Sequence, residues 1–233
     1  MSLKYLQQQY KLYDRGNEYL WNDFPDLRWV HNKLELALRC GYNAGPIPVL
    51  PSTSGYFCVR PIYNMTGYGI YARKLWIDKD DQASMYDIHP GEFWTEWWTG
   101  NHYSIDYVWE NNWVPIFATQ GKNNDDNLLK FEYWKKIDPP NIQLPKFLDE
   151  LAPSKVLNIE FKDAKIIEIH LRLGNVLGDW RGVDDDSTVI IVAWRDKYKK
   201  DADKMKAQGY KFVENYDHDF SYIEEPRLGF WYK

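Results

Sequence analysis

The sequence has few cysteines and no long apolar run, and each absence removes a class of protein. Cys40 and Cys58 are the two cysteines among 233 residues, too few for a disulfide scaffold and not spaced as a C-x-x-C pair, so we interpret both as reduced thiols. No apolar stretch approaches the roughly 18 residues that a membrane-spanning helix needs. Residues 1–9 lack the apolar segment of a signal peptide. We therefore expect a cytoplasmic protein without membrane association.

Positive charge is also scarce. The chain carries 29 Lys and Arg against 34 Asp and Glu, a net charge of −5, whereas a general nucleic-acid binder needs an excess of cations to neutralise phosphates. The sequence contains no Gly-x-Ser-x-Gly elbow, no Walker A loop and no His-Glu-x-x-His helix. These absences exclude the commonest sequence signatures of hydrolases, P-loop NTPases and zinc proteases.

Aromatic residues, in contrast, are abundant. Trp, Tyr and Phe number 12, 18 and 10 and make up 17% of the chain. Rings at this density fill a core, stack on bases or bind a sugar or peptide. Composition alone does not choose among these three.

Hydrophobic spacing predicts a mixture of helices and strands. Apolar residues at Val30, Leu34, Ala37 and Leu38 follow helical spacing, so we predict one helix over residues 27–39. Alternation over residues 103–109 predicts a strand. A charged helix is expected near residues 197–208.

The segment 157–172 alternates between apolar and polar residues in two halves, which fixes the register of a predicted hairpin. If Glu160 faces Glu168, one face of the hairpin is wholly apolar, and sliding by one residue would bury charges. The apolar pairs expected in this register are Ile159 with Ile169, Phe161 with Ile167, and Leu157 with Leu171. The other face holds Asn158, Glu160, Glu168, His170 and Arg172. An odd loop at residues 163–165 closes the predicted hairpin.

Two facing carboxylates repel each other unless a cation lies between them. Mg²⁺ is one candidate, because it takes carboxylate oxygens and bridges substrate phosphates. The alternative is that Arg172, His170 or a lysine neutralises the pair on a solvated sheet face. Spacing alone leaves both open.

This hairpin resembles the metal-binding hairpin of the ATP-grasp superfamily. Asn-Ile-Glu-Phe at 158–161 and Ile-Ile-Glu-Ile-His-Leu-Arg at 166–172 are similar to a pattern in which an acidic residue, a Glu-x-Asn and a following Arg surround magnesium. The resemblance implies that Glu160 and Glu168 are metal ligands. His170 stands at the Asn position, although imidazole suits softer metals. Arg172 matches the Arg that contacts phosphate or the acyl intermediate.

Three further segments resemble the superfamily in the expected order. His-Asn-Lys-Leu at 31–34 is similar to the opening of the helix before the nucleotide-binding lobe. Arg60, with Pro61 and the loop containing Gly67 and Gly69, resembles the Lys-Pro strand and the loop that covers ATP phosphates, with Arg in place of Lys. Residues 96–106 resemble the hinge that holds adenine and ribose, which implies nucleotide contacts for Glu96 and Trp98.

The resemblance implies an α+β fold in which two lobes with mostly antiparallel sheets enclose a nucleotide cleft. The expected parts are an N-terminal segment (1–27), a small lobe (28–93), a large lobe with the metal hairpin (94–175) and a C-terminal α/β extension packed on the large lobe (176–233).

The implied function is ATP- and Mg²⁺-dependent ligation. A carboxylate of a small molecule or peptide is activated as an acyl phosphate for attack by an amine or similar nucleophile. Arg60 and Arg172 are the residues that the resemblance assigns to catalysis. Two alternatives remain: a compact, catalytically degenerate nucleotide-binding protein, as in a viral genome, and an aromatic-rich carbohydrate- or peptide-binding module.

Overall fold

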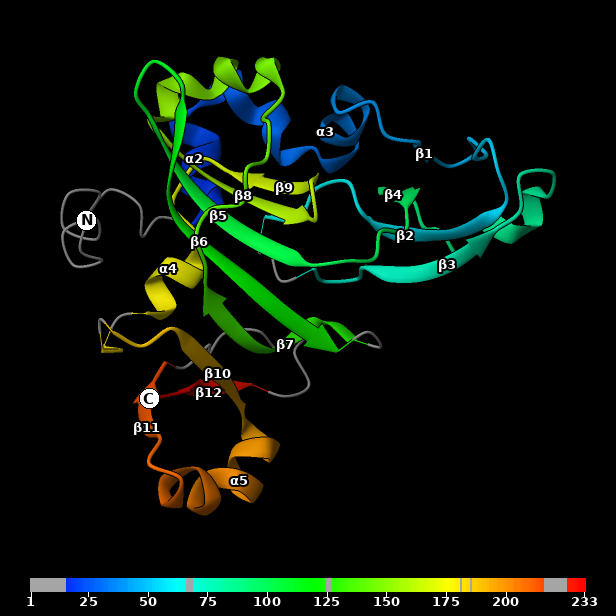
Figure 1. Ribbon diagram of the computed structural model, residues 1–233. Helices are drawn as coiled ribbons and strands as arrows, with labels where there is room; N and C mark the ends of the chain where they lie inside the picture. The colour runs from blue at the N-terminus through cyan, green and yellow to red at the C-terminus, as the bar shows by residue number, and fades with distance from the viewer. Residues whose placement is uncertain (1–15, 66–68, 125–126, 181, 185, 216–225) are drawn as a thin grey trace.

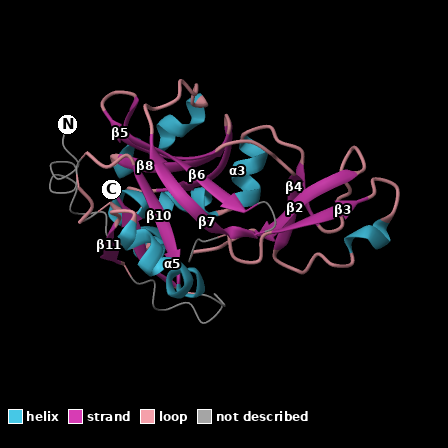
Figure 2. Cartoon of the chain, turned by 60° about the horizontal axis from the view of Figure 1, so that its bottom comes forward, coloured by secondary structure: helices cyan, strands magenta, loops and turns pink. Residues whose placement is uncertain are grey.

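The computed structural model describes residues 16–65, 69–124, 127–180, 182–184, 186–215 and 226–233. Within these residues the strands form two antiparallel sheets, a four-stranded one and an eight-stranded one. The smaller sheet projects to one side of the larger (Figures 1 and 2). This α+β architecture with antiparallel sheets confirms the predicted fold class.

The small sheet has the strand order β1-β4-β2-β3. Its strands are β1 (Ala44–Pro46), β4 (Glu92–Glu96), β2 (Gly55–Pro61) and β3 (Arg73–Ile77). Alternation along β2 buries Phe57 and Val59 in a core with Trp94. The neighbouring residues Cys58 and Arg60 therefore point to the opposite face.

The large sheet has the order β11-β12-β10-β7-β6-β5-β8-β9. Its strands in chain order are β5 (His102–Trp109), β6 (Trp113–Asn124), β7 (Asn127–Lys136), β8 (Val156–Lys162), β9 (Lys165–His170), β10 (Val189–Trp194), β11 (Lys211–Glu214) and β12 (Arg227–Tyr232). The strand predicted at 103–109 is confirmed as β5. Strand β4 crosses the expected lobe boundary between residues 93 and 94, and β10 continues the large sheet by pairing with β7.

Short helices from the N-terminal part of the chain cover one face of the large sheet. They are α2 (Asn17–Asp23), the 3-10 helix η2 (Pro25–His31) and α3 (Lys33–Arg39), joined there by the 3-10 helix η4 (Lys146–Ser154). Leu20 and Leu36 share a buried core with Leu157 and Ile169 of the sheet. The other helices are η3 (Gln82–Met85), α4 (Asn175–Asp179) and α5 (Arg195–Ala207), and α5 confirms the helix expected near 197–208. Among the described residues, no helix combines the length and the apolar character needed to cross a bilayer.

The prediction of one continuous helix over 27–39 is wrong, because the helix is interrupted at Asn32. The Asn32 side chain accepts the Glu35 N–H at 2.9 Å and so caps a new helix, α3. Asn favours such caps over helix interiors because its side chain competes for backbone N–H groups. Asn32 also bridges to Tyr63, and the Lys33 N–H donates to the Ile62 carbonyl at 2.9 Å. The interruption therefore ties the start of α3 to the end of β2.

Candidate functional site

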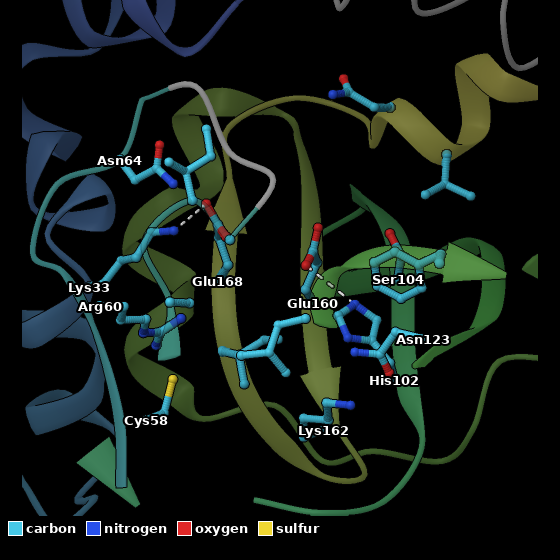
Figure 3. A pocket seen from close by; sticks show the side chains of 18 of the residues that line it. Lys33, Cys58, Arg60, Asn64, His102, Ser104, Asn123, Glu160, Lys162 and Glu168 are labelled. Atoms are coloured by element: carbon cyan, nitrogen blue, oxygen red, sulfur yellow. Dashed lines mark ion pairs between the residues drawn. The ribbon is translucent and has the colours of Figure 1, made fainter. Parts of the chain in front are cut away.

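A cavity of about 220 Å³ lies where the small sheet, the β8–β9 hairpin and the large sheet meet. Figure 3 shows side chains from all three around it. Of the predicted site residues, the ones that line it are Arg60, Gly69, Glu96, Trp98, Glu160, Glu168, His170 and Arg172. Gly67 lies outside the described residues. The structure thus brings together residues of three motifs that are up to 112 residues apart in the sequence, counting from Arg60 to Arg172.

The hairpin has the predicted register at its functional positions. Glu160 pairs with Glu168 and Ile159 with Ile169. The apolar residues of both strands lie in the large core, which confirms the predicted apolar face; they are Leu157, Ile159, Phe161, Ile166 and Ile169.

The register nevertheless shifts beyond Glu160, and the predicted pair of Phe161 with Ile167 is wrong. A bulge places Ile166 opposite Phe161, so that Ile167 faces the cavity instead. The turn is then two residues long, between the paired Lys162 and Lys165, rather than the three expected. Strand β9 ends at His170, so Leu171 lies beyond the ladder in which it was expected to pair. A bulge adds one residue to a strand and so changes the direction in which the neighbouring side chains point.

Glu168 is held by a buried ion pair. The Lys33 Nζ lies 2.9 Å from Glu168 Oε1, and both side chains are largely shielded from water (Figure 3). Burial raises the pKa of Glu168, but the Lys33 ammonium, followed by His170, lowers that pKa below the ordinary range of a glutamate. Glu168 is therefore ionised and paired with a lysine. One of the two sequence alternatives named a lysine, but on a solvated sheet face, whereas this ion pair is buried.

Glu160 has a different partner on the other side of the hairpin. Its Oε2 lies 3.3 Å from Nε2 of His102, which is the first residue of β5. Burial raises the pKa of Glu160, the His102 and His170 rings lower it, and the net shift is downward. Two ionised carboxylates thus face each other across the hairpin, each with a partner on its outer side (Figure 3).

His170 is buried and neutral. Burial lowers its pKa to about 4, its Nδ1 lies 3.3 Å from Asn17 Oδ1, and its Nε2 lies 3.6 Å from Glu168 Oε1. Because a carbonyl oxygen accepts, Nδ1 carries the proton and Nε2 keeps its lone pair.

Within the described ranges, no group of three His, Cys, Asp or Glu side chains is arranged to hold a metal ion by itself. Mg²⁺ fits such a site, since it is usually bound by one or two carboxylates together with phosphates. The two ionised carboxylates of the hairpin supply that number. A ligand role for His170 stays a prediction.

Arg60 brings a buried hydrogen-bond donor to this cavity. Its Nε is buried and has no hydrogen-bond partner in the part of the chain that the structure describes. The guanidinium lies 5.3 Å from the ring of Phe93. A buried donor without an acceptor costs about 1–3 kcal/mol, which a bound phosphate would offset.

Arg172 is positioned by a buried polar network that the sequence did not reveal. Asp106 Oδ1 accepts the Gly174 N–H at 2.7 Å and the Asn158 amide at 2.9 Å. A Cβ at Gly174 would lie 2.6 Å from Asn158 Nδ2, so the network leaves room only for glycine. Burial raises the pKa of Asp106 to about 7, against the lowering effect of these two donors. The turn that carries Arg172 into the cavity is thereby fixed to β5 and β8.

Beyond the hairpin, the cavity continues along β7, β10, β12 and α4. We call this part the aromatic half, lined by Phe131, Trp134, Val176, Val192 and Trp194. The part lined by Lys33, Arg60, Glu160 and Glu168 we call the charged half. Sequence reasoning missed the aromatic half, because the segment after residue 176 contains no recognisable motif. Lys33 and His102 were present in the quoted motifs, but nothing in their spacing indicated the carboxylates that they contact.

The tryptophans do not gather on one open face. Trp76 is 51% exposed and is the one tryptophan of the described chain among its exposed large side chains. Trp94, Trp113, Trp134, Trp180 and Trp231 are buried. Most rings therefore fill the core or line the cavity.

No protein-family model and no curated protein sequence matches the chain. Solved structures do match. N5-carboxyaminoimidazole synthetase from Staphylococcus aureus superposes with a TM-score of 0.51 at 9% identity over 87% of this chain and 66% of its own. Its complex with ADP superposes with a TM-score of 0.51 at 11% identity, over 87% of this chain and 67% of its own. L-amino acid ligase from Bacillus licheniformis superposes with a TM-score of 0.49 at 12% identity, over 88% of this chain and 68% of its own.

A protein of the ATP-grasp superfamily from Archaeoglobus fulgidus gives a TM-score of 0.41 at 10% identity, over 88% of this chain and 64% of that one. The chain thus spans about two thirds of the length of the solved proteins that it matches. Identities this low establish a shared fold and leave the activity to be argued from the site. The antiparallel α+β architecture and the superposition on the two S. aureus synthetase structures show that the chain has the ATP-grasp fold.

Proposed function

We propose that the chain binds ATP with Mg²⁺ in the charged half of the cavity and uses it to activate a carboxylate for ligation. The observation that carries the proposal is the pair of facing, ionised carboxylates, Glu160 and Glu168, beside the buried and unsatisfied Nε of Arg60. Phosphate oxygens would satisfy Arg60, and a magnesium ion would be shared by phosphates and carboxylates. The matching S. aureus synthetase was solved with ADP, which agrees with a nucleotide in this fold.

The proposed reaction has two steps. A carboxylate oxygen of the substrate attacks the γ-phosphorus of ATP, the bond to the β–γ bridging oxygen breaks, and ADP leaves. An amine or similar nucleophile then attacks the carbonyl carbon of the acyl phosphate, releasing inorganic phosphate and a proton. Magnesium, when bound, supplies neutralisation of the phosphate charges. The chain contributes positioning and charge.

Each residue has a role in keeping with its place. Arg60 binds phosphate oxygens from the small sheet, and Arg172, which lines the cavity from the turn after β9, stabilises the negative charge that develops in both steps. Glu96 and Trp98, at the end of β4 and just beyond it, hold the adenosine, and Gly69, which also lines the cavity, contacts the phosphates. Glu160 and Glu168 hold the metal.

One observation favours a second candidate, a nucleotide-binding protein that does not transfer phosphate. Lys33 already occupies an oxygen of Glu168 at 2.9 Å and so competes with a metal for that carboxylate. If Lys33 remains in place when ATP binds, magnesium keeps Glu160 alone as a full ligand. Nucleotide binding would then persist without ADP release.

A thermal-shift measurement with ATP, with and without Mg²⁺, tests both candidates. At 100 times its Kd, a ligand that binds only the native state stabilises it by about 2.7 kcal/mol. We expect a magnesium-dependent rise in the melting temperature that is lost in Glu168→Ala and kept in Glu150→Ala, a matched change at an exposed ion pair with Arg39.

ADP release in the presence of carboxylic acids and amines separates the ligase from the binding protein. No shift with ATP in the wild type would reject both.

A further inference from the structure

The aromatic half of the cavity has rigid apolar walls. The rings of Phe131 and Trp134 stack with centroids 4.3 Å apart and an interplanar angle of 30°. The Trp194 Nε1 donates to the Phe131 carbonyl at 2.8 Å, which fixes the indole beside that pair. Val192 is buried on β10. Side chains held by such contacts are pre-organised for an apolar ligand, which then binds at little entropic cost.

Two charged residues of the cavity, Asp179 and Arg227, form an ion pair beside the aromatic walls. Both terminal nitrogens of Arg227 contact the Asp179 carboxylate at 3.1 Å, one to each oxygen, in a bidentate pair. Asn215 adds a hydrogen bond of 3.1 Å to Asp179. Asp179 and Arg227 line the cavity from α4 and β12, the elements that carry or adjoin the aromatic half. A second anionic group of a ligand would therefore meet a guanidinium already committed to a carboxylate.

The two halves meet at the turn after β9. Arg172 lines the cavity there, with Glu160 and Glu168 on the hairpin side and Val176 of α4 on the aromatic side. A molecule that places its carboxylate at this turn can therefore extend its other end along the aromatic walls.

From this arrangement we propose that the substrate is a monocarboxylic acid with an uncharged aromatic or branched aliphatic body. Its carboxylate lies at Arg172, and its body packs on Trp134, Val192 and Trp194. The proposal rests on the proposed ligase function and names its substrate class. Acids with a phosphate or a second carboxylate at the far end are disfavoured, because an unpaired anion against apolar walls loses its hydration without compensation.

Binding of two acids by calorimetry to the full chain, with and without ATP and Mg²⁺, tests the substrate class. The probes are 3-phenylpropionate, whose far end is a phenyl ring, and glutarate, whose far end is a second carboxylate. We expect 3-phenylpropionate to bind at least about tenfold more tightly than glutarate. Equal binding, or tighter binding of glutarate, would overturn the proposal.

A single substitution should reverse the selectivity. Asp179→Asn releases Arg227 from its carboxylate and so supplies a cation for the far end of a diacid. The ratio of the two affinities is expected to move at least about tenfold toward glutarate. Asp184→Asn is the matched control, since it breaks the ion pair with Lys211, which is not among the cavity residues, and it should leave the ratio unchanged.

A second variant keeps the test decisive if Asp179→Asn does not fold. Val176→Asp places an anion in the aromatic half, where it should weaken 3-phenylpropionate at least about tenfold, while the exposed Val49→Asp should not. Unchanged binding in Val176→Asp would overturn the proposal.

The ATP-induced thermal shift, measured on the same variants, reports the nucleotide site independently. Selective binding of 3-phenylpropionate without an ATP shift would support the apolar acid site and reject the ligase function.

Discussion

The charged half and the aromatic half of the cavity differ in how their buried polar groups are paired. In the charged half, Arg60 Nε is left without an acceptor among the described residues and two carboxylates face each other. In the aromatic half, Asp179 and Arg227 pair with each other and rings form the walls. In our proposals, the facing carboxylates and Arg60 take a ligand that brings phosphate and metal. The walls beside the Asp179–Arg227 pair take the part of a ligand that brings no charge.

The largest expected effect concerns the ion pair that partly completes the charged half. Lys33→Met leaves Glu168 as a buried carboxylate without its ammonium, so we expect a loss of about 3–5 kcal/mol in the free energy of unfolding. Arg39→Met, which breaks exposed pairs with Glu35 and Glu150, should cost about 1 kcal/mol or less. Urea unfolding of both variants measures this. Equal losses would mean that the Lys33 pair is not shielded as the structure has it.

The next effect concerns Asp106, at the junction of the halves. Its folded-state pKa of about 7 lies above the unfolded value of 3.8. The stability that this shift contributes is therefore fully present below pH 4 and is lost as the pH rises through 7. Relative to Asp106→Asn, the wild type should lose about 3–4 kcal/mol over this window. Urea unfolding at pH values from 4 to 8 measures the difference, and parallel curves for the two proteins would contradict it.

A smaller effect on stability is expected from alanine substitutions at two glycines in or next to α4. Gly174→Ala forces its Cβ against Asn158 Nδ2 at 2.6 Å, so it should displace the network that holds Arg172 and cost about 1–3 kcal/mol. Gly178 lies within α4, and a Cβ there would meet nothing within 4 Å, so Gly178→Ala should stabilise by about 0.5–1 kcal/mol. Thermal unfolding tests this: the melting temperature should fall in Gly174→Ala and rise in Gly178→Ala.

The smallest effect returns to the charged half. Arg60→Lys keeps the positive charge but loses the planar fork that binds two phosphate oxygens at once. We expect ATP to bind about fivefold more weakly, roughly 1 kcal/mol, with Mg²⁺ still required. Lys74→Arg, on the neighbouring strand, should leave the ATP affinity unchanged, and equal effects of the two variants would place the phosphates elsewhere.

Sequence patterns were sufficient for the hairpin because its two faces differ so strongly. A slip by one residue from the pairing of Glu160 with Glu168 would have put charged residues on the apolar face, and the structure has that pair. The bulge next to it was not predictable, since Ile166 and Ile167 are equally apolar and either could face Phe161. In the same way, Asn32 lies within an apolar pattern of helical spacing, and only its contacts with Glu35 and Tyr63 reveal the interruption.

The aromatic half could not be found from the sequence for a different reason. Its walls come from β7, β10 and β12, and the pairing of β10 with β7 joins residues more than 50 positions apart, such as Val189 and Lys135. No local pattern encodes which strand becomes a neighbour at that distance. The charged half, in contrast, lies on short motifs whose spacing is visible in the sequence.

The packing of the first helices on the large sheet also determines the order in which the chain can fold. Leu20 and Leu36 share a core with Leu157 and Ile169, and the whole small sheet lies between them in the sequence. The chain must lose the conformational entropy of closing this long loop before those contacts can form, and folding that depends on such distant contacts is slow. During synthesis, the early helices therefore lack their partner strands until the β8–β9 hairpin has left the ribosome. The small sheet, in contrast, can form as soon as β4 has been synthesised.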